Sequence, residues 1–124
     1  MYVVGNAVKE IVGMAFDSFL NNDLELAAKI EPLEELIDNL CDELKLHHVQ
    51  RLKNGVCSIS SGFVFNDILN DYERIADHCS NIAVAMIALE SDSFDTHAYL
   101  DSVKRLKTET YARYFEAYSR KYAI

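Results

Sequence analysis

An unbroken helical repeat of apolar residues between positions 65 and 89 constrains this sequence more than any other feature. Its apolar side chains follow one another in alternating steps of three and four residues. This spacing predicts one long helix whose narrow apolar seam packs against a partner helix. The members of the seam are Phe65, Ile68, Tyr72, Ile75, Cys79, Ile82, Met86 and Leu89. A chain organised around such a helix is expected to form a helical bundle.

Two further apolar patterns precede this helix. A broad stripe predicts a first helix over residues 3–20, which ends at the turn-forming cluster 21–23. A second seam predicts a helix from residue 24 to about residue 53, opened by an N-x-x-E capping box of Asn22 and Glu25. Asn54-Gly55 is the expected stop of that helix.

The single proline, Pro32, lies inside the second seam. Proline disfavours a continuous helix, so a break at residues 30–31 is one alternative. Because the apolar register is unchanged on both sides of Pro32, the pattern favours one kinked helix over residues 24–53.

The remaining chain predicts two helices. The seam helix is expected to begin at a cap formed by Ser58 or Ser60 and to run to about Leu89, followed by a turn over residues 90–93. A fourth helix is expected to start between residues 94 and 96 and to continue almost to the C-terminus. Its tyrosine stripe predicts packing on the bundle, with a dimer contact as the alternative. The stripe consists of Tyr111, Tyr114, Tyr118 and Tyr122.

With 124 residues and no strand-like alternation, the expected fold class is all-α. We expect one domain over residues 1–124, an up-and-down antiparallel helical bundle.

The net charge of −8 would repel phosphate backbones, so no nucleic-acid binding is expected. Three cysteines match no zinc spacing and are expected to be reduced thiols. The longest apolar run, residues 82–89, is far shorter than the ~20 residues that span a bilayer, so the chain as given is expected to be soluble, without direct membrane insertion.

Two pairs of carboxylates form the principal candidate site. Glu34 and Asp38 are four residues apart on the second helix, and Glu73 and Asp77 have the same spacing on the third. Like charges at this spacing repel each other, and two such pairs on neighbouring antiparallel helices would favour a cation between them. The alternative is a solvated acidic face without a ligand. The residues that extend the column on the third helix are Asn70 and Asn81.

No catalytic constellation accompanies these acids. His47 and His48 are consecutive, so their side chains diverge on a helix and cannot chelate one ion. His78 follows Asp77 and is a candidate peripheral ligand. The sequence contains no Glu-x-x-His or His-Glu-x-x-His pair, no glycine-rich phosphate loop and no nucleophile with a local base. The chain is therefore not expected to be an enzyme.

The segment NDYERIADHCSNIA, residues 70–83, resembles the ERIxDHxxNIA signature of PhoU-like phosphate-regulatory domains. Residues 22–40, NDLELAAKIEPLEELIDNL, resemble the other signature helix of that family. Residues 44–69 and the closing residues 94–124 look like the cytoplasmic C-terminal PhoU domain of bacterial sodium/phosphate cotransporter family proteins. The resemblance implies a PhoU-like three-helix unit with an added C-terminal fourth helix.

The resemblance also implies metal binding on the bundle surface through E(D)xxxD motifs. In this sequence the motifs are Glu34-x-x-x-Asp38 and Glu73-x-x-x-Asp77. The motifs do not distinguish between Fe, Mn, Mg and Zn ions. Asp23 matches the acidic residue that opens the second helix, where its role can be that of a helix-terminus charge alone. The further candidate ligands are Asn70, His78, Asn81 and Asp23.

The function implied is that of a non-catalytic regulatory domain of a sodium/phosphate cotransporter-like protein. The chain would be a fragment of a longer membrane transporter, at the cytoplasmic face of the cell membrane, with a transmembrane transporter domain in the same polypeptide. A homodimer is a further expected partner, because a full PhoU has two such bundles. The alternatives are a free-standing PhoU-like adaptor for a sensor kinase or an ABC-type phosphate uptake system, and a plain helical oligomerisation module.

Overall fold

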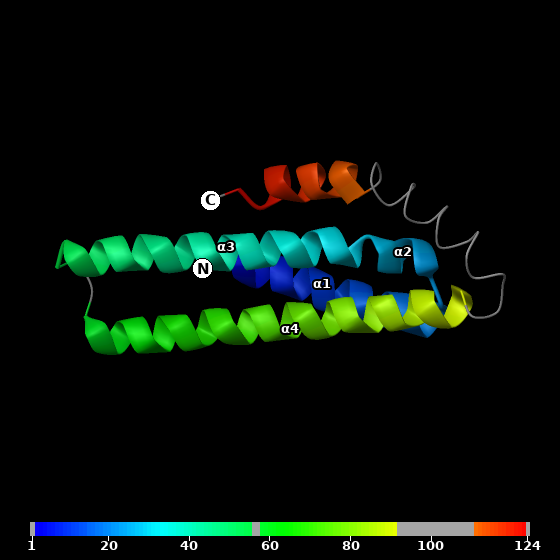
Figure 1. Ribbon diagram of the computed structural model, residues 1–124, viewed down its shortest axis with the longest axis horizontal. Coiled ribbons are helices and arrows are strands. Elements are labelled where there is room, and N and C mark those ends of the chain that lie inside the picture. The colour runs from blue at the N-terminus through cyan, green and yellow to red at the C-terminus, as the bar shows by residue number, and fades with distance from the viewer. Residues whose placement is uncertain (1, 56–57, 92–110, 124) are drawn as a thin grey trace.

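The computed structural model describes residues 2–55, 58–91 and 111–123. Its helices are α1 (Tyr2–Asn21), α2 (Leu24–Ala28), α3 (Ile30–Lys53) and α4 (Ile59–Ser91) (Figure 1). Residues 111–121 are also helical, whereas the predicted start of the fourth helix lies outside the described residues. No strand occurs within these three ranges. The all-α fold class is therefore confirmed.

The long helices run up, down and up, as a helical bundle requires. α3 and α4 form a long antiparallel hairpin, and α1 packs along one half of it (Figure 1). α1 runs parallel to α4, so that Gly5 lies beside the Tyr72 hydroxyl and Val12 lies near Cys79. No helix among the described residues is both long enough and apolar enough to cross a membrane.

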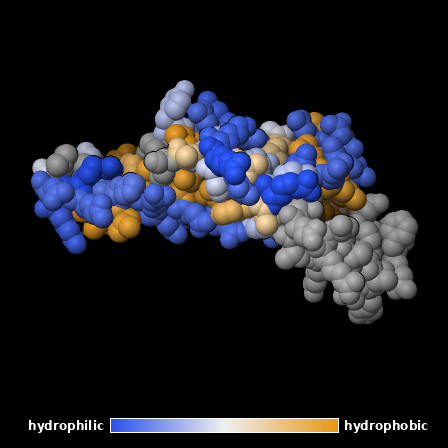
Figure 2. Space-filling view, turned by 90° about the horizontal axis from the view of Figure 1, so that it is seen from above, coloured by the Kyte–Doolittle hydropathy of each residue, from blue (hydrophilic) through white to orange (hydrophobic). Residues whose placement is uncertain are grey.

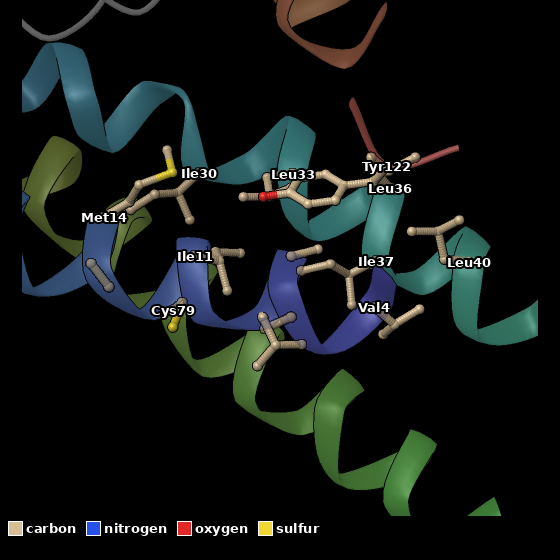
Figure 3. Close-up of a cluster of buried hydrophobic side chains, with 14 of the residues drawn as sticks. Val4, Ile11, Met14, Ile30, Leu33, Leu36, Ile37, Leu40, Cys79 and Tyr122 are labelled. Carbon is tan, nitrogen blue, oxygen red and sulfur yellow. The ribbon is translucent and has the colours of Figure 1, made fainter. Parts of the chain in front are cut away.

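The core lies where α1, α2, α3 and α4 meet. Val4 and Ile11 of α1 and Ile37 of α3 point toward one another in this cluster (Figure 3). Cys41 and Cys79 are buried free thiols, and Cys57 lies outside the described residues. On the face seen in Figure 2, hydrophilic residues surround smaller apolar patches.

The buried face of α4 differs from the predicted seam. Leu69 and Ala76 are fully buried, whereas Ile68 and Ile75, each one position earlier, remain partly exposed. The buried stripe of α4 is rotated relative to the predicted seam because α4 contacts α1 on one side and α3 on the other. Small residues such as Ala76 allow the helices to approach closely. Only half of the seam is buried or packed against the core: Phe65, Tyr72, Cys79 and Met86.

The prediction of one kinked helix through Pro32 is wrong. α2 ends at Ala28, and α3 begins at Ile30. In a continuous helix, the proline ring would clash with the carbonyl group four residues earlier, which belongs to Ala28. The break one turn before Pro32 removes this clash and places the proline in the first turn of α3, where it needs no backbone N–H.

The helix caps follow the predictions in two of three places. Ser58 caps α4, and its hydroxyl accepts a hydrogen bond of 3.2 Å from the Ser61 N–H. Gly55, with φ of 71°, follows the end of α3. The predicted Asn22–Glu25 box is wrong, because Asp23 is the N-cap of α2 and accepts a 3.1 Å hydrogen bond from the backbone N–H three residues on. Asn22 has φ of 49°, which turns the chain before the cap.

The C-terminal tyrosines Tyr118 and Tyr122 pack on the bundle, where they contact α1 and the hydrophobic core. The Tyr118 hydroxyl donates to the Met14 sulfur at 3.7 Å, and the buried Tyr122 donates to Glu10. Lys121 forms an ion pair of 3.1 Å with the same Glu10. These contacts confirm the packing prediction for this part of the tyrosine stripe.

Candidate functional site

The antiparallel packing of α3 and α4 brings the four predicted carboxylates to one groove. Glu34 and Asp38 line it from α3, and Glu73 and Asp77 line it from α4. The groove is open and has a volume of about 760 Å³. The i,i+4 spacing places each pair on one helix face, and the hairpin turns these faces toward each other. The other lining residues are Asp67, Asn70, Asp71 and Arg74.

Of the acids that line this groove, Glu34 has the most strongly raised pKa. Burial, a hydrogen bond with Asp38 and the negative charges of Asp38, Asp77 and Glu31 raise the pKa of Glu34 from 4.5 to about 7. Burial also raises the pKa of Asp38; the hydrogen bond from protonated Glu34 opposes this rise, and the charges of Glu73, Asp42 and Asp77 add to it. The groove therefore favours the uptake of positive charge, either as a proton or as a cation.

Lys45 contacts two of the groove residues and was not singled out by the sequence pattern. Its ammonium group donates to Asn70 Oδ1 at 2.9 Å and pairs with Glu73 Oε1 at 3.1 Å. Lys45 lies seven residues after Asp38, two helical turns along the same face of α3, and this spacing is the signal that could have found it. The lysine therefore holds Glu73 and Asn70 at one end of the groove.

The further candidate ligands are distributed unevenly. Asn70 lines the groove, whereas His78 and Asn81 are exposed on α4 and are not among the lining residues. Asp23 caps α2, which agrees with a structural role at the helix terminus.

The donor chemistry of the groove fits a hard cation. Carboxylate and amide oxygens suit Mg²⁺, Mn²⁺ and iron. The lining residues include no His or Cys, the ligands that are typical of structural Zn²⁺ sites. Among the described residues, no three His, Cys, Asp or Glu side chains already converge on one point. The backbone therefore brings the four acids to one groove without arranging them as a preformed coordination sphere.

Comparisons with known proteins agree with this architecture. The family described as "PhoU domain" matches residues 3–86, which span α1, α2, α3 and most of α4. A curated protein of Thermotoga maritima, the "Phosphate-specific transport system accessory protein PhoU homolog 1", is 29% identical over 87 residues, or 70% of this chain. The aligned part spans 37% of that longer relative. No solved structure matches the chain significantly. The chain belongs to the PhoU domain family.

Proposed function

We propose that this chain is a non-catalytic regulatory domain of phosphate transport that responds to a hard cation bound in the α3/α4 groove. Membership of the PhoU domain family and the accessory role named for the curated relative support the regulatory part. The observation that carries the cation part is the gathering of Glu34, Asp38, Glu73 and Asp77 in one groove with mutual repulsion. Mg²⁺, Mn²⁺ and iron are the candidate ions.

The chain's own residues would hold the ion between two helices. Asp38 and Glu34 would bind from α3 and Asp77 from α4, while Glu73 would first have to leave Lys45. A bound cation supplies the positive charge that offsets the repulsion in the groove. Binding of the cation would therefore make the packing of α3 against α4 depend on the concentration of the ion. Phosphate, an anion, would approach these acids only through such a cation.

Two molecular settings are compatible with this role. The likeness of residues 44–69 and 94–124 to cotransporter PhoU domains favours a cytoplasmic domain attached to a transmembrane sodium/phosphate cotransporter domain in the same polypeptide. The accessory protein named in the comparison favours the second setting, a separate adaptor for a phosphate uptake system. Apolar spans of about 20 residues encoded in the same reading frame would identify the first setting, and a reading frame without them would identify the second.

Isothermal titration with Mn²⁺, Mg²⁺ and Fe²⁺ tests the cation proposal. We expect Asp38→Asn and Asp77→Asn each to weaken binding at least about tenfold, because each removes a charged oxygen ligand. The matched control is Asp17→Asn on the exposed surface of α1, which should bind as the wild type does. Absence of binding to the wild-type chain would identify the acids as a solvated face and the chain as a plain helical module.

Lys45→Gln is expected to strengthen Mn²⁺ binding by up to about fivefold, since a partly exposed ion pair is worth up to about 1 kcal/mol. The lysine competes with the metal for Glu73, and glutamine keeps the side-chain length without the charge. The same titration measures the effect, with Lys53→Gln at the exposed end of α3 as the control. Weaker binding by Lys45→Gln would show that Glu73 is not a ligand in competition with the lysine.

A further inference from the structure

The sequence around the turn between α3 and α4 differs in charge from the rest of the chain. All 20 Asp and Glu residues lie outside residues 44–66, whereas Lys45, Arg51 and Lys53 lie within this range. The chain as a whole carries a net charge of −8. One end of an otherwise acidic bundle is therefore positively charged.

This basic end forms an arm that extends beyond α1. Because α1 runs parallel to α4 and Gly5 lies beside Tyr72, α1 begins about level with Leu69. Residues 59–67 of α4 and residues 46–53 of α3 therefore project past α1 as a two-helix arm (Figure 1). Two helices alone cannot enclose apolar side chains on every side, so some of those on the arm remain in contact with water.

The two helices of the arm pack closely at His48 and Gly62. His48 is buried, and a Cβ atom at position 62 would overlap its Nε2 atom. The His48 ring also packs against Phe65, with 5.1 Å between the ring centroids. The Arg51 guanidinium group lies 5.7 Å from the centroid of the same Phe65 ring. The arm is therefore a packed helix pair that can present its outer side chains to a partner.

Large apolar side chains project from this arm into water. Ile59 and Phe63 of α4 are 71% and 69% exposed. Leu46 and Val49 of α3 are 57% and 46% exposed. At the rise of an α-helix, each lies within about 11 Å of the end of its helix at the turn. Lys53 is exposed at the same end of the molecule. Exposed apolar residues together with basic residues are typical of surfaces that bind anionic membranes.

We propose that the arm binds the surface of an anionic phospholipid bilayer. Ile59 and Phe63 would enter the boundary between headgroups and acyl chains, and Lys53 and Arg51 would pair with lipid phosphate groups. Interfacial side chains reach about 5–10 Å into this boundary, a depth that covers the first two turns of α4. Such binding is peripheral and requires no helix that crosses the membrane. The proposal does not depend on a cation in the α3/α4 groove.

The charge of the arm favours a lipid surface over a protein partner. Cytoplasmic loops of membrane proteins are rich in Lys and Arg, which would repel Arg51 and Lys53, whereas anionic headgroups attract them. Lysine is also depleted in protein–protein interfaces. An anionic bilayer would repel the acidic remainder of the bundle, so the chain would bind with the arm toward the lipid.

Sedimentation of the full chain with lipid vesicles in a chelating buffer tests the proposal without cation bridging. We expect binding to vesicles of phosphatidylcholine and phosphatidylglycerol in a roughly 3:1 ratio, and at least about tenfold weaker binding to phosphatidylcholine alone. Lys53→Glu should weaken binding to the anionic vesicles at least about tenfold, because it changes the charge at the lipid surface by two units. The matched control is Lys9→Glu on the exposed surface of α1, which should bind about as the wild type does.

A single tryptophan locates the lipid contact independently, because the chain contains none. In Phe63→Trp, anionic vesicles should shift the fluorescence emission to shorter wavelength as the indole ring leaves water. Phe16→Trp is the matched control, since Phe16 is 64% exposed but lies in the second half of α1, away from the arm. Its emission should stay unchanged. Circular dichroism confirms that each variant is folded.

Absence of binding to the anionic vesicles would overturn the proposal and would leave an acidic segment of a protein as the partner that fits the charge of the arm. Equal binding to vesicles with and without phosphatidylglycerol would also contradict it. So would equal losses of binding in Lys53→Glu and Lys9→Glu, or equal emission shifts in Phe63→Trp and Phe16→Trp.

Discussion

Replacing Leu69 with alanine is expected to lower the free energy of unfolding by about 2–5 kcal/mol, the range for fully buried leucines. Leu69 has no exposed surface and belongs to the hydrophobic core, where its truncation leaves a cavity. The adjacent Ile68→Ala should cost no more than about 1.5 kcal/mol, because Ile68 stays partly in water in the native chain. Urea unfolding of both variants, at a concentration that keeps the chain monomeric, measures the difference.

This pair of variants distinguishes the two possible orientations of α4. A larger cost for Ile68→Ala would mean that the heptad seam is centred on the core and that α4 is rotated relative to the structure. A larger cost for Leu69→Ala supports the observed orientation, which leaves Ile75 and Ile82 available on the surface. Far-ultraviolet circular dichroism should show the same helix content in both variants.

The stability of the wild-type chain is expected to fall as the pH rises from about 4.5 to about 7. Because the folded-state pKa of Glu34 is raised to about 7, the folded chain binds this proton more tightly than the unfolded chain does. The stabilisation is complete below the unfolded-state pKa and is lost as Glu34 ionises beside Asp38 and Asp77. The raised pKa of Asp38 acts in the same direction.

Glu34→Gln should remove most of this pH dependence and raise the free energy of unfolding at pH 8 by about 1–2 kcal/mol, after allowance for solvent screening. Urea unfolding at pH 5 and pH 8, in the presence of a chelator, measures the effect. Glu35→Gln, an exposed neighbour outside the groove, is the matched control. If the free energy of unfolding of Glu34→Gln depended on pH as that of the wild type does, ionisation of Glu34 would not be the cause of the pH dependence.

Most of the fold follows from local sequence signals. The helices α1, α3 and α4, the stop at Gly55 and the cap at Ser58 were predictable because apolar periodicity and backbone preferences act within a few residues. The orientation of α4 was not predictable from its repeat, because a three-four pattern describes a helix with one partner and α4 packs between two. The helix breaks before Pro32 because the break removes the clash between the proline ring and the preceding turn. The apolar register is the same on both sides of the proline, so the pattern could not indicate this break.

The four carboxylates of the candidate site were predictable from the sequence, but their contact with Lys45 was not. Equal i,i+4 spacing on two adjacent antiparallel helices is enough to bring Glu34, Asp38, Glu73 and Asp77 to one groove. The contact of Lys45 with Glu73 joins residues 28 positions apart and depends on the relative offset of α3 and α4. That offset is fixed by tertiary packing, which no local pattern specifies.

The most direct test of the cation site is a crystal grown with Mn²⁺ and measured for anomalous scattering at the manganese edge. The proposed function predicts an anomalous peak in the α3/α4 groove, within coordination distance of carboxylate oxygens from both Asp38 and Asp77. An empty groove in crystals with Mn²⁺ in excess, with Glu34 still hydrogen-bonded to Asp38, would contradict it.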